Sequence, residues 1–205
     1  MTSKFLHLAT TPAVAAMQER YLGRVHPVGA PPPDDKLGDV ERGFIQARDS
    51  FYMATVTETG WPYAQHRGGP AGFLRVLSDN RLGFADVRGN RQLLSTGNLM
   101  ANNRVALFLM DYPQRSRLKI LGHARVIAAS ENPTLAAELT MKGLGPAERL
   151  FMIDVVAYDW NCPKYITPRY TREEVQQVVA PLQKQIAELE TKLAAFRSQT
   201  GEFKS

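Results

Sequence analysis

Hydrophobic and polar positions alternate in short runs through the middle of the chain, a pattern typical of half-buried β-strands. The first run, residues 50–57, is rich in aromatic and β-branched residues and ends at the turn signal Glu58-Thr59-Gly60. Similar runs joined by tight turns predict further strands over residues 61–66, 72–77, 81–86, 104–111, 117–129 and 150–159. With a single helical insert near residues 90–102, this pattern predicts a mainly β fold, a closed or partly open antiparallel barrel.

Helical signals flank the predicted barrel on its N-terminal side. Thr11 is the predicted N-cap of a short helix, Pro12 its first residue and Gly23 its C-terminal stop. The proline-rich residues 25–36 predict a surface connection, because proline removes the backbone donors that regular helix needs. Apolar residues at helical spacing predict a second helix over residues 37–48.

A separate helix is predicted at the C-terminal end. Thr171 and Glu174 form a Thr-x-x-Glu capping box, and Pro181 should kink or restart the helix that follows. Apolar residues at alternating spacings of four and three then form a heptad seam, which we expect to pack on the body of the protein or on a second copy: Val175, Val179, Leu182, Ile186, Leu189, Leu193 and Phe196. Residues 201–205 should be disordered.

These patterns divide the chain into three parts. Residues 1–36 form an N-terminal helix and arm, residues 37–168 the barrel, and residues 169–205 the heptad helix and tail. The composition, with 44% hydrophobic and 22% charged residues, is ordinary for a soluble domain. No apolar run is long enough for a bilayer, no secretory signal is present, and the single Cys162 cannot form an internal disulfide. We therefore expect a cytoplasmic protein without a membrane or zinc role.

The net charge of +5 is unevenly distributed. Residues 67–125 hold ten basic and three acidic side chains, a net of +7, whereas the segments on either side are each close to neutral. Such a segment suits an anionic partner, which is a phosphate-bearing cofactor, a nucleic acid or an acidic substrate. The alternative is a basic solvated face.

Two stretches carry candidate chemistry. Gln65-His66-Arg67-Gly68-Gly69-Pro70 follows a predicted strand, and it combines a guanidinium with paired glycines that allow close backbone approach; the alternative is a hairpin loop with an exposed arginine. Asp86-Val87-Arg88-Gly89-Asn90-Arg91-Gln92 leads into a helix expected to begin near Asn90, where free N–H groups and arginines suit a phosphate. No nucleophile or metal motif is present, so any redox chemistry would belong to a bound cofactor.

Four segments in this order give the chain its resemblance to a known family. They are residues 44–56, residues 82–91 together with 98–109, residues 117–125, and Asn161-Cys162-Pro163-Lys164-Tyr165-Ile166, which is similar to a signature of one bacterial branch. Over about residues 40–167 the chain resembles the FMN-binding split-barrel superfamily related to pyridoxamine 5′-phosphate oxidase. The resemblance implies an antiparallel split barrel that forms an obligate homodimer, with FMN at each of two subunit-interface sites.

The resemblance also implies which residues meet the cofactor. The expected contacts are Arg67, Asn90, Arg91, Gln92 and Lys119 at the phosphate side, Gln65, His66, Gly68 and Gly69 at the flavin edge, and Phe84, Ala85 and Asp86 along the pocket wall. Cys162, Lys164 and Tyr165 are the candidates for a substrate pocket. Metal ligands are not expected.

Two departures from the sequence pattern of the oxidase limit which of its properties the resemblance implies for this chain. Gly89-Asn90-Arg91 replaces a Ser-Arg-Lys triplet, and the C-terminal Arg-Leu-x-x-Arg segment that recognises pyridoxal phosphate is missing. We therefore expect an FMN-dependent oxidoreductase acting on an unidentified small molecule, with NADPH or oxygen as redox partner. The alternatives are a non-catalytic flavin carrier or sensor, and a haem-handling protein with His66 or His123 as ligand. Nucleic acid is not expected, because the arginines sit at strand ends around a concave site.

Overall fold

The computed structural model describes residues 3–160 and 164–201. Its contacts divide the chain into two compact units, which we describe separately. The first unit consists of Met1–Asp111 and Arg115–Tyr165, and the second consists of Tyr112–Gln114 and Ile166–Ser205.

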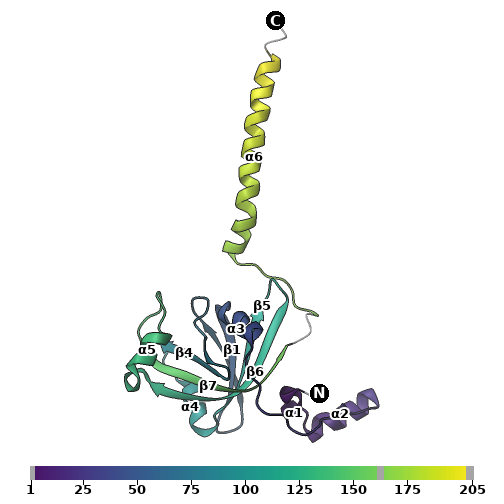
Figure 1. The fold of residues 1–205 in the computed structure, drawn as a ribbon, viewed down its shortest axis with the longest axis vertical. Coiled ribbons are helices and arrows are strands. Elements are labelled where there is room, and N and C mark those ends of the chain that lie inside the picture. The colour runs from purple at the N-terminus through teal and green to yellow at the C-terminus, as the bar shows by residue number, and fades with distance from the viewer. Residues whose placement is uncertain (1–2, 161–163, 202–205) are drawn as a thin grey trace. The chain divides into compact units, whose positions relative to one another are not determined.

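Seven antiparallel strands build the first unit (Figure 1). They lie in one sheet in the order β2-β1-β5-β6-β7-β4-β3, with β2 and β3 at its edges. The strands are β1 (Ser50–Val56), β2 (Pro62–Gly68), β3 (Arg75–Ser78), β4 (Arg81–Val87), β5 (Arg104–Asp111), β6 (Ser116–Ala128) and β7 (Ala147–Trp160). The mainly β, antiparallel split-barrel prediction is confirmed, in a form whose sheet is not closed by hydrogen bonds between β2 and β3.

The core follows from the period-two alternation that predicted the strands. In β1 the side chains of Phe51, Met53 and Thr55 are buried, while the residues between them are more exposed. Phe84 of β4 stacks on Phe151 of β7 with ring centroids 4.8 Å apart. These rings form the floor beneath the site described below.

The first unit also contains several helical segments. They are α1 (Lys4–Ala9), α2 (Pro12–Leu22), α3 (Asp39–Gln46), α4 (Leu94–Ala101), the 3-10 turn η1 (Ala129–Glu131) and α5 (Pro133–Leu139). The predicted caps of α2 are confirmed, because the Thr11 side chain accepts from the Val14 N–H and Gly23 adopts a φ of 64°.

The prediction of a single helical insert was wrong, because α5 forms a second one between β6 and β7. The Asn132 side chain caps it, and Leu139 is fully buried. At seven residues it is too short for its apolar periodicity to stand out in the sequence.

The predicted start of the helix between β4 and β5, near Asn90, was also wrong. Helix α4 begins at Leu94, and residues 88–93 form a loop in which Arg91 and Leu93 take left-handed φ values of 58° and 56°. The Asn90 side chain accepts from the Gln92 N–H in this loop, a local bond that competes with helix. The helix therefore starts four residues later than the arginine-containing motif suggested.

The second unit is dominated by α6 (Arg172–Gly201). Its predicted capping box is confirmed, with the Glu174 N–H donating to Thr171 Oγ1 at 3.1 Å and the Thr171 N–H donating to Glu174 Oε2 at 2.7 Å. Pro181 lies within one continuous helix, so the helix does not restart there. Gly201 is helical, and the rest of the tail predicted to be disordered lies outside the described residues.

Over the part of the chain that the structure describes, no helix has the length and hydropathy needed to cross a bilayer.

Candidate functional site

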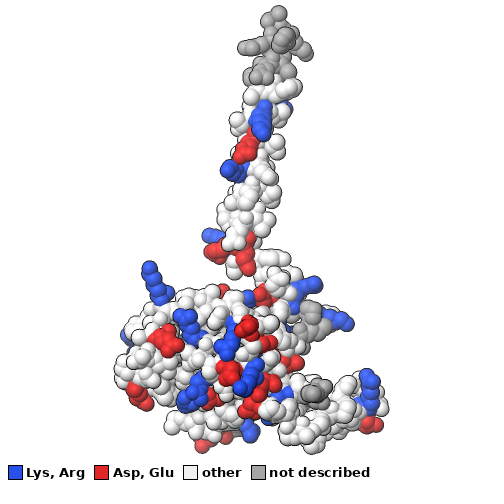
Figure 2. Space-filling model, viewed as in Figure 1, with Lys and Arg blue, Asp and Glu red and all other residues white. Residues whose placement is uncertain are grey.

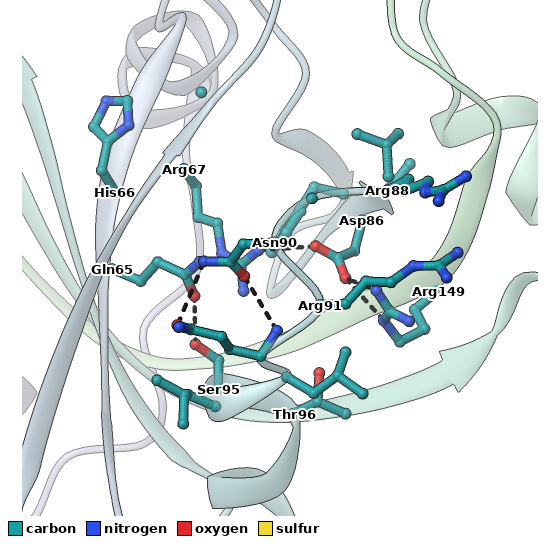
Figure 3. Close-up of a pocket in the computed structure, with 18 of the residues that line it drawn as sticks. Gln65, His66, Arg67, Asp86, Arg88, Asn90, Arg91, Ser95, Thr96 and Arg149 are labelled. Carbon is teal, nitrogen blue, oxygen red and sulfur yellow. Dashed lines mark hydrogen bonds and ion pairs between the residues drawn. The ribbon is translucent and has the colours of Figure 1, made fainter.

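A cavity of about 290 Å³ opens between β2, β4, the 88–93 loop and the start of α4 (Figure 3). Ten of the twelve cofactor contacts expected from the resemblance line it. These are Gln65, His66, Arg67, Gly68, Phe84, Ala85, Asp86, Asn90, Arg91 and Gln92. The cavity is also lined by Tyr63, Phe73, Val87, Arg88, Gly89, Leu93, Leu94, Ser95, Thr96 and Arg149.

One carboxylate holds two arginines at the back of the cavity. Asp86 Oδ1 accepts from Arg67 Nη1 at 2.8 Å, and Asp86 Oδ2 accepts from Arg149 Nε at 2.8 Å and lies 2.7 Å from Arg149 Nη2. The register of the antiparallel β4–β7 pair creates this arrangement, because it places Asp86 directly opposite Arg149. All three side chains are 21% exposed or less, so these charge-assisted bonds are shielded from water.

Arg67 contacts Asp86 and two phenyl rings. Its guanidinium carbon lies 5.6 Å from the ring centroid of Phe84 and 5.0 Å from that of Phe151. Burial lowers the pKa of Arg67, while the charge and hydrogen bond of Asp86 act in the opposite direction. Its buried Nε has no hydrogen-bond partner in the described structure, so a donor is left for a ligand.

The mouth of the cavity carries further cations. Arg91 Nη2 donates to Glu148 Oε1 at 2.9 Å, which lowers the pKa of Glu148, and Glu148 also pairs with Arg149 at 3.2 Å. Arg88 is exposed at the rim and forms no ion pair within the described residues. Four lining arginines face one lining carboxylate, so the cavity has a net positive charge and suits an anion.

Helix α4 presents its N-terminus to the same space. The first-turn N–H groups of a helix have no intrahelical partner, and the N-cap residue here, Leu93, makes no side-chain bond that would satisfy one of them. Ser95 is buried and donates from Oγ to Gln65 Oε1 at 2.9 Å, and Asn98 donates to Thr55 Oγ1 at 2.9 Å. These two bonds fix the helix end against β1 and β2, where its positive dipole end adds to the arginine charges.

Comparison with protein families gives one match that decides the family. Residues 37–148 match the family described as pyridoxamine 5′-phosphate oxidase, which is more than half of the chain and takes in nearly the whole cavity lining. The chain belongs to the pyridoxamine 5′-phosphate oxidase family. The family resemblance stated from the sequence is thereby confirmed, while the Asn161–Ile166 branch signature lies beyond the matched residues and stays a prediction.

Solved structures with a similar fold include three bacterial proteins. HupZ of Group A Streptococcus is 14% identical with a TM-score of 0.48, covering 65% of this chain and 99% of its own. General Stress Protein 26 of Bacillus anthracis is 17% identical with a TM-score of 0.45, covering 63% and 93%. A pyridoxamine 5′-phosphate oxidase-related, FMN binding protein of Nostoc punctiforme is 15% identical with a TM-score of 0.41, covering 58% and 76%. Comparison with curated proteins found no match.

In this pyridoxamine 5′-phosphate oxidase family member, three of the expected cofactor contacts lie differently from expectation. His66 lines the cavity, but its side chain alternates onto the other face of β2 and lies 5.5 Å from the Tyr52 ring (Figure 3). Gly69 lies outside the lining, against Phe73. Lys119 also lies outside it, paired with Asp159 at 2.7 Å and 4.4 Å from the Phe5 ring centroid.

The substrate-pocket candidates are not brought to this cavity. Lys164 and Tyr165 are exposed and do not line it, and Cys162 lies outside the described residues. No group of three or more His, Cys, Asp or Glu side chains that could hold a metal ion occurs among residues 3–160 and 164–201.

Sequence reasoning missed Arg149. Its strand was expected to begin at Leu150, and nothing in the local pattern connects Arg149 with a residue 63 positions away. The available signal was that Asp86 is one of only three carboxylates among ten basic residues in segment 67–125, which implied that cations would gather around it.

Proposed function

We propose that this family member binds FMN in the arginine-lined cavity and acts as an FMN-dependent oxidoreductase on a small molecule. One observation carries the proposal. Four arginines, three of them within the region that matches the family, and an uncapped helix start converge on one concave space. That chemistry recognises a phosphate monoester in a concave small-molecule site.

The residues present fit FMN. The first turn of α4 with Ser95 and Thr96, together with the Arg88 and Arg91 side chains, would hold the phosphate. The unpartnered Nε of Arg67 supplies a buried donor toward the rest of the cofactor. The β2 backbone beside Gln65 and the Ala85-Asp86 segment of β4 would line the flavin edge.

When bound, FMN supplies the hydride or electron exchange, which no side chain of this chain can supply. The side chains of the protein contribute electrostatic and steric effects around the ligand. Arg67, fixed by Asp86 and two phenyl rings, keeps a positive charge beside the ligand and stabilises negative charge that accumulates there. Phe84 and Phe73 exclude water from the inner wall.

We also propose that the site is completed in a homodimer. A cavity of about 290 Å³ is at the lower end of the range for small-molecule sites, so a second copy covering its open side would enclose the cofactor. Substrate and a redox partner, either NADPH or oxygen, would then reach the flavin from the uncovered edge.

Flavin titration tests the proposal. The purified full chain is mixed with increasing FMN, and quenching of flavin fluorescence and the change in its visible absorbance band are followed. We expect saturable binding at one FMN per chain. An FMN signal unchanged by the protein at every concentration would overturn the proposal.

Turnover separates the enzyme from a carrier. The FMN-loaded protein is mixed anaerobically with NADPH, bleaching of the flavin band is recorded, and oxygen or an artificial acceptor is then admitted. Repeated bleaching and recovery supports the oxidoreductase. Stable FMN binding without bleaching by NADPH or another reductant supports the flavin carrier or sensor instead.

A further inference from the structure

Helix α6 carries a continuous apolar seam on its exposed surface. Val175, Leu182, Ile186, Leu189 and Leu193 are between 47% and 64% exposed. Their spacing repeats every seven residues, with Val179, Ile186 and Leu193 at heptad position a and Val175, Leu182, Leu189 and Phe196 at position d. A strict a/d seam is the contact surface of a coiled coil, narrower than the face a helix uses to cover a globular core.

The charge of α6 argues against its binding a membrane or a nucleic acid. Residues 172–201 contain four basic and four acidic side chains, so the helix has no net charge to attract an anionic membrane or a nucleic acid. The flanking e and g positions are polar apart from Val178: Gln176, Gln183, Glu190 and Arg197 at e, and Gln185, Lys192 and Gln199 at g. Apart from Val178, the large exposed apolar side chains of the helix therefore lie on the seam.

We propose that α6 pairs with α6 of a second copy as a parallel, two-stranded coiled coil. Of the residues at a, Val179 and Ile186 are β-branched, and the central residues at d are leucines, the combination that favours parallel dimers. Pro181 falls at position c, off the seam, so the backbone bond it removes leaves the a and d contacts in place.

The area available meets what a specific dimer needs. Each half-exposed side chain of the seam presents on the order of 100 Å², so burying six from each copy removes about 1,200 Å² from water, which reaches the range of specific interfaces. The pairing requires no contribution from the flavin site. The proposed pairing of α6 can therefore be tested independently of the proposed function.

Cysteine cross-linking of the full chain tests the pairing and its direction. In a Cys162→Ser background, which removes the single native thiol, Val175→Cys and Leu193→Cys are made separately. In a parallel coil each cysteine faces its own counterpart, so each variant alone forms a disulfide-linked dimer under mild oxidation, seen on a non-reducing denaturing gel. Thr191→Cys, at the outward position f, is the matched control and stays monomeric on the gel.

The other outcomes overturn the proposal. Since residues 175 and 193 lie about 27 Å apart along the helix, an antiparallel pair would cross-link only when the two variants are mixed. A seam that packs on its own body or on another protein would leave both single variants no more cross-linked than Thr191→Cys. Loss of helical circular dichroism in a variant is checked first, and Leu182→Cys and Leu189→Cys then serve as replacements.

Discussion

Asp86 is the residue on which the charge arrangement of the cavity depends. Its two oxygens accept hydrogen bonds from Arg67 and Arg149 and form ion pairs with both, and its side chain is 14% exposed. Without this carboxylate the two guanidiniums would be held together, partly desolvated, with Glu148 as the remaining anion near Arg149. The carboxylate is therefore a positioning group, and its loss should weaken the fold locally.

Asp86→Asn should lower the free energy of unfolding by about 2–3 kcal/mol, because it leaves partly buried cations without their counterion. Urea unfolding measures the change. Asp154→Asn is the matched control, since Asp154 pairs with the more exposed Arg81 and Arg125 and should cost less than about 1 kcal/mol. Equal effects of the two substitutions would contradict a special role for Asp86.

Arg67→Ala should weaken FMN binding without unfolding the sheet. The substitution removes a charge-assisted contact worth about 1.5–3 kcal/mol, which corresponds to roughly a 10- to 150-fold rise in Kd. Arg91→Ala should act in the same direction but less strongly, since its side chain is 57% exposed. Fluorescence titration measures both variants against Arg75→Ala, an exposed arginine of β3 outside the cavity lining. Unchanged affinity in both variants would show that the phosphate binds elsewhere.

Among the elements, the long β6–β7 hairpin positions Arg149 and is sensitive to one glycine. Gly122 lies at the register shift in β6, and a Cβ added there would come 2.6 Å from the carbonyl oxygen of Asp154. This distance is too short for any side chain, so the two strands would have to separate.

Gly122→Ala should therefore destabilise the protein by about 1–3 kcal/mol, the usual cost of overpacking. Gly145→Ala is its control, because an added Cβ at that position meets no atom within 4 Å. Thermal unfolding of the two variants compares them directly. A Gly122→Ala protein as stable as the control would mean that the bulge relaxes freely.

Over the whole molecule, the basic surplus divides between the site and the surface. Of the ten basic residues in segment 67–125, Arg67, Arg88 and Arg91 line the cavity, and the fourth lining arginine, Arg149, comes from outside that segment. Other basic residues form ion pairs on the surface, such as Arg81 and Arg125 with Asp154 (Figure 2 shows the mixture of signs on one face).

This division predicts a salt-dependent preference for the phosphorylated flavin. FMN binding should weaken as ionic strength rises, because the cavity attracts a dianion, whereas riboflavin, which has no phosphate, should bind more weakly and show little salt dependence. Titrations of both flavins at low and high sodium chloride measure the difference. Equal affinity for FMN and riboflavin would show that the cavity arginines do not bind the phosphate.

Strand positions were predictable because alternation depends only on local sequence. The predicted β5, residues 104–111, coincides with the observed strand, and β1 and β4 differ from prediction by one residue at their ends. The start of α4 was not predictable in the same way. Tertiary bonds from Ser95 and Asn98 fix that helix end on β2 and β1, and no local pattern reports such bonds.

The sequence by itself determined the mainly β fold, the caps of α2 and α6, the family, and the concentration of arginines near one pair of strand ends. Tertiary structure alone decided that Arg149 joins Arg67 on Asp86, that the His66 ring lies beside Tyr52, and that Lys119 pairs with Asp159 and does not line the cavity. The physical reason is register. Periodicity sets the face on which a side chain lies, but only the pairing of strands distant in sequence sets which side chains meet.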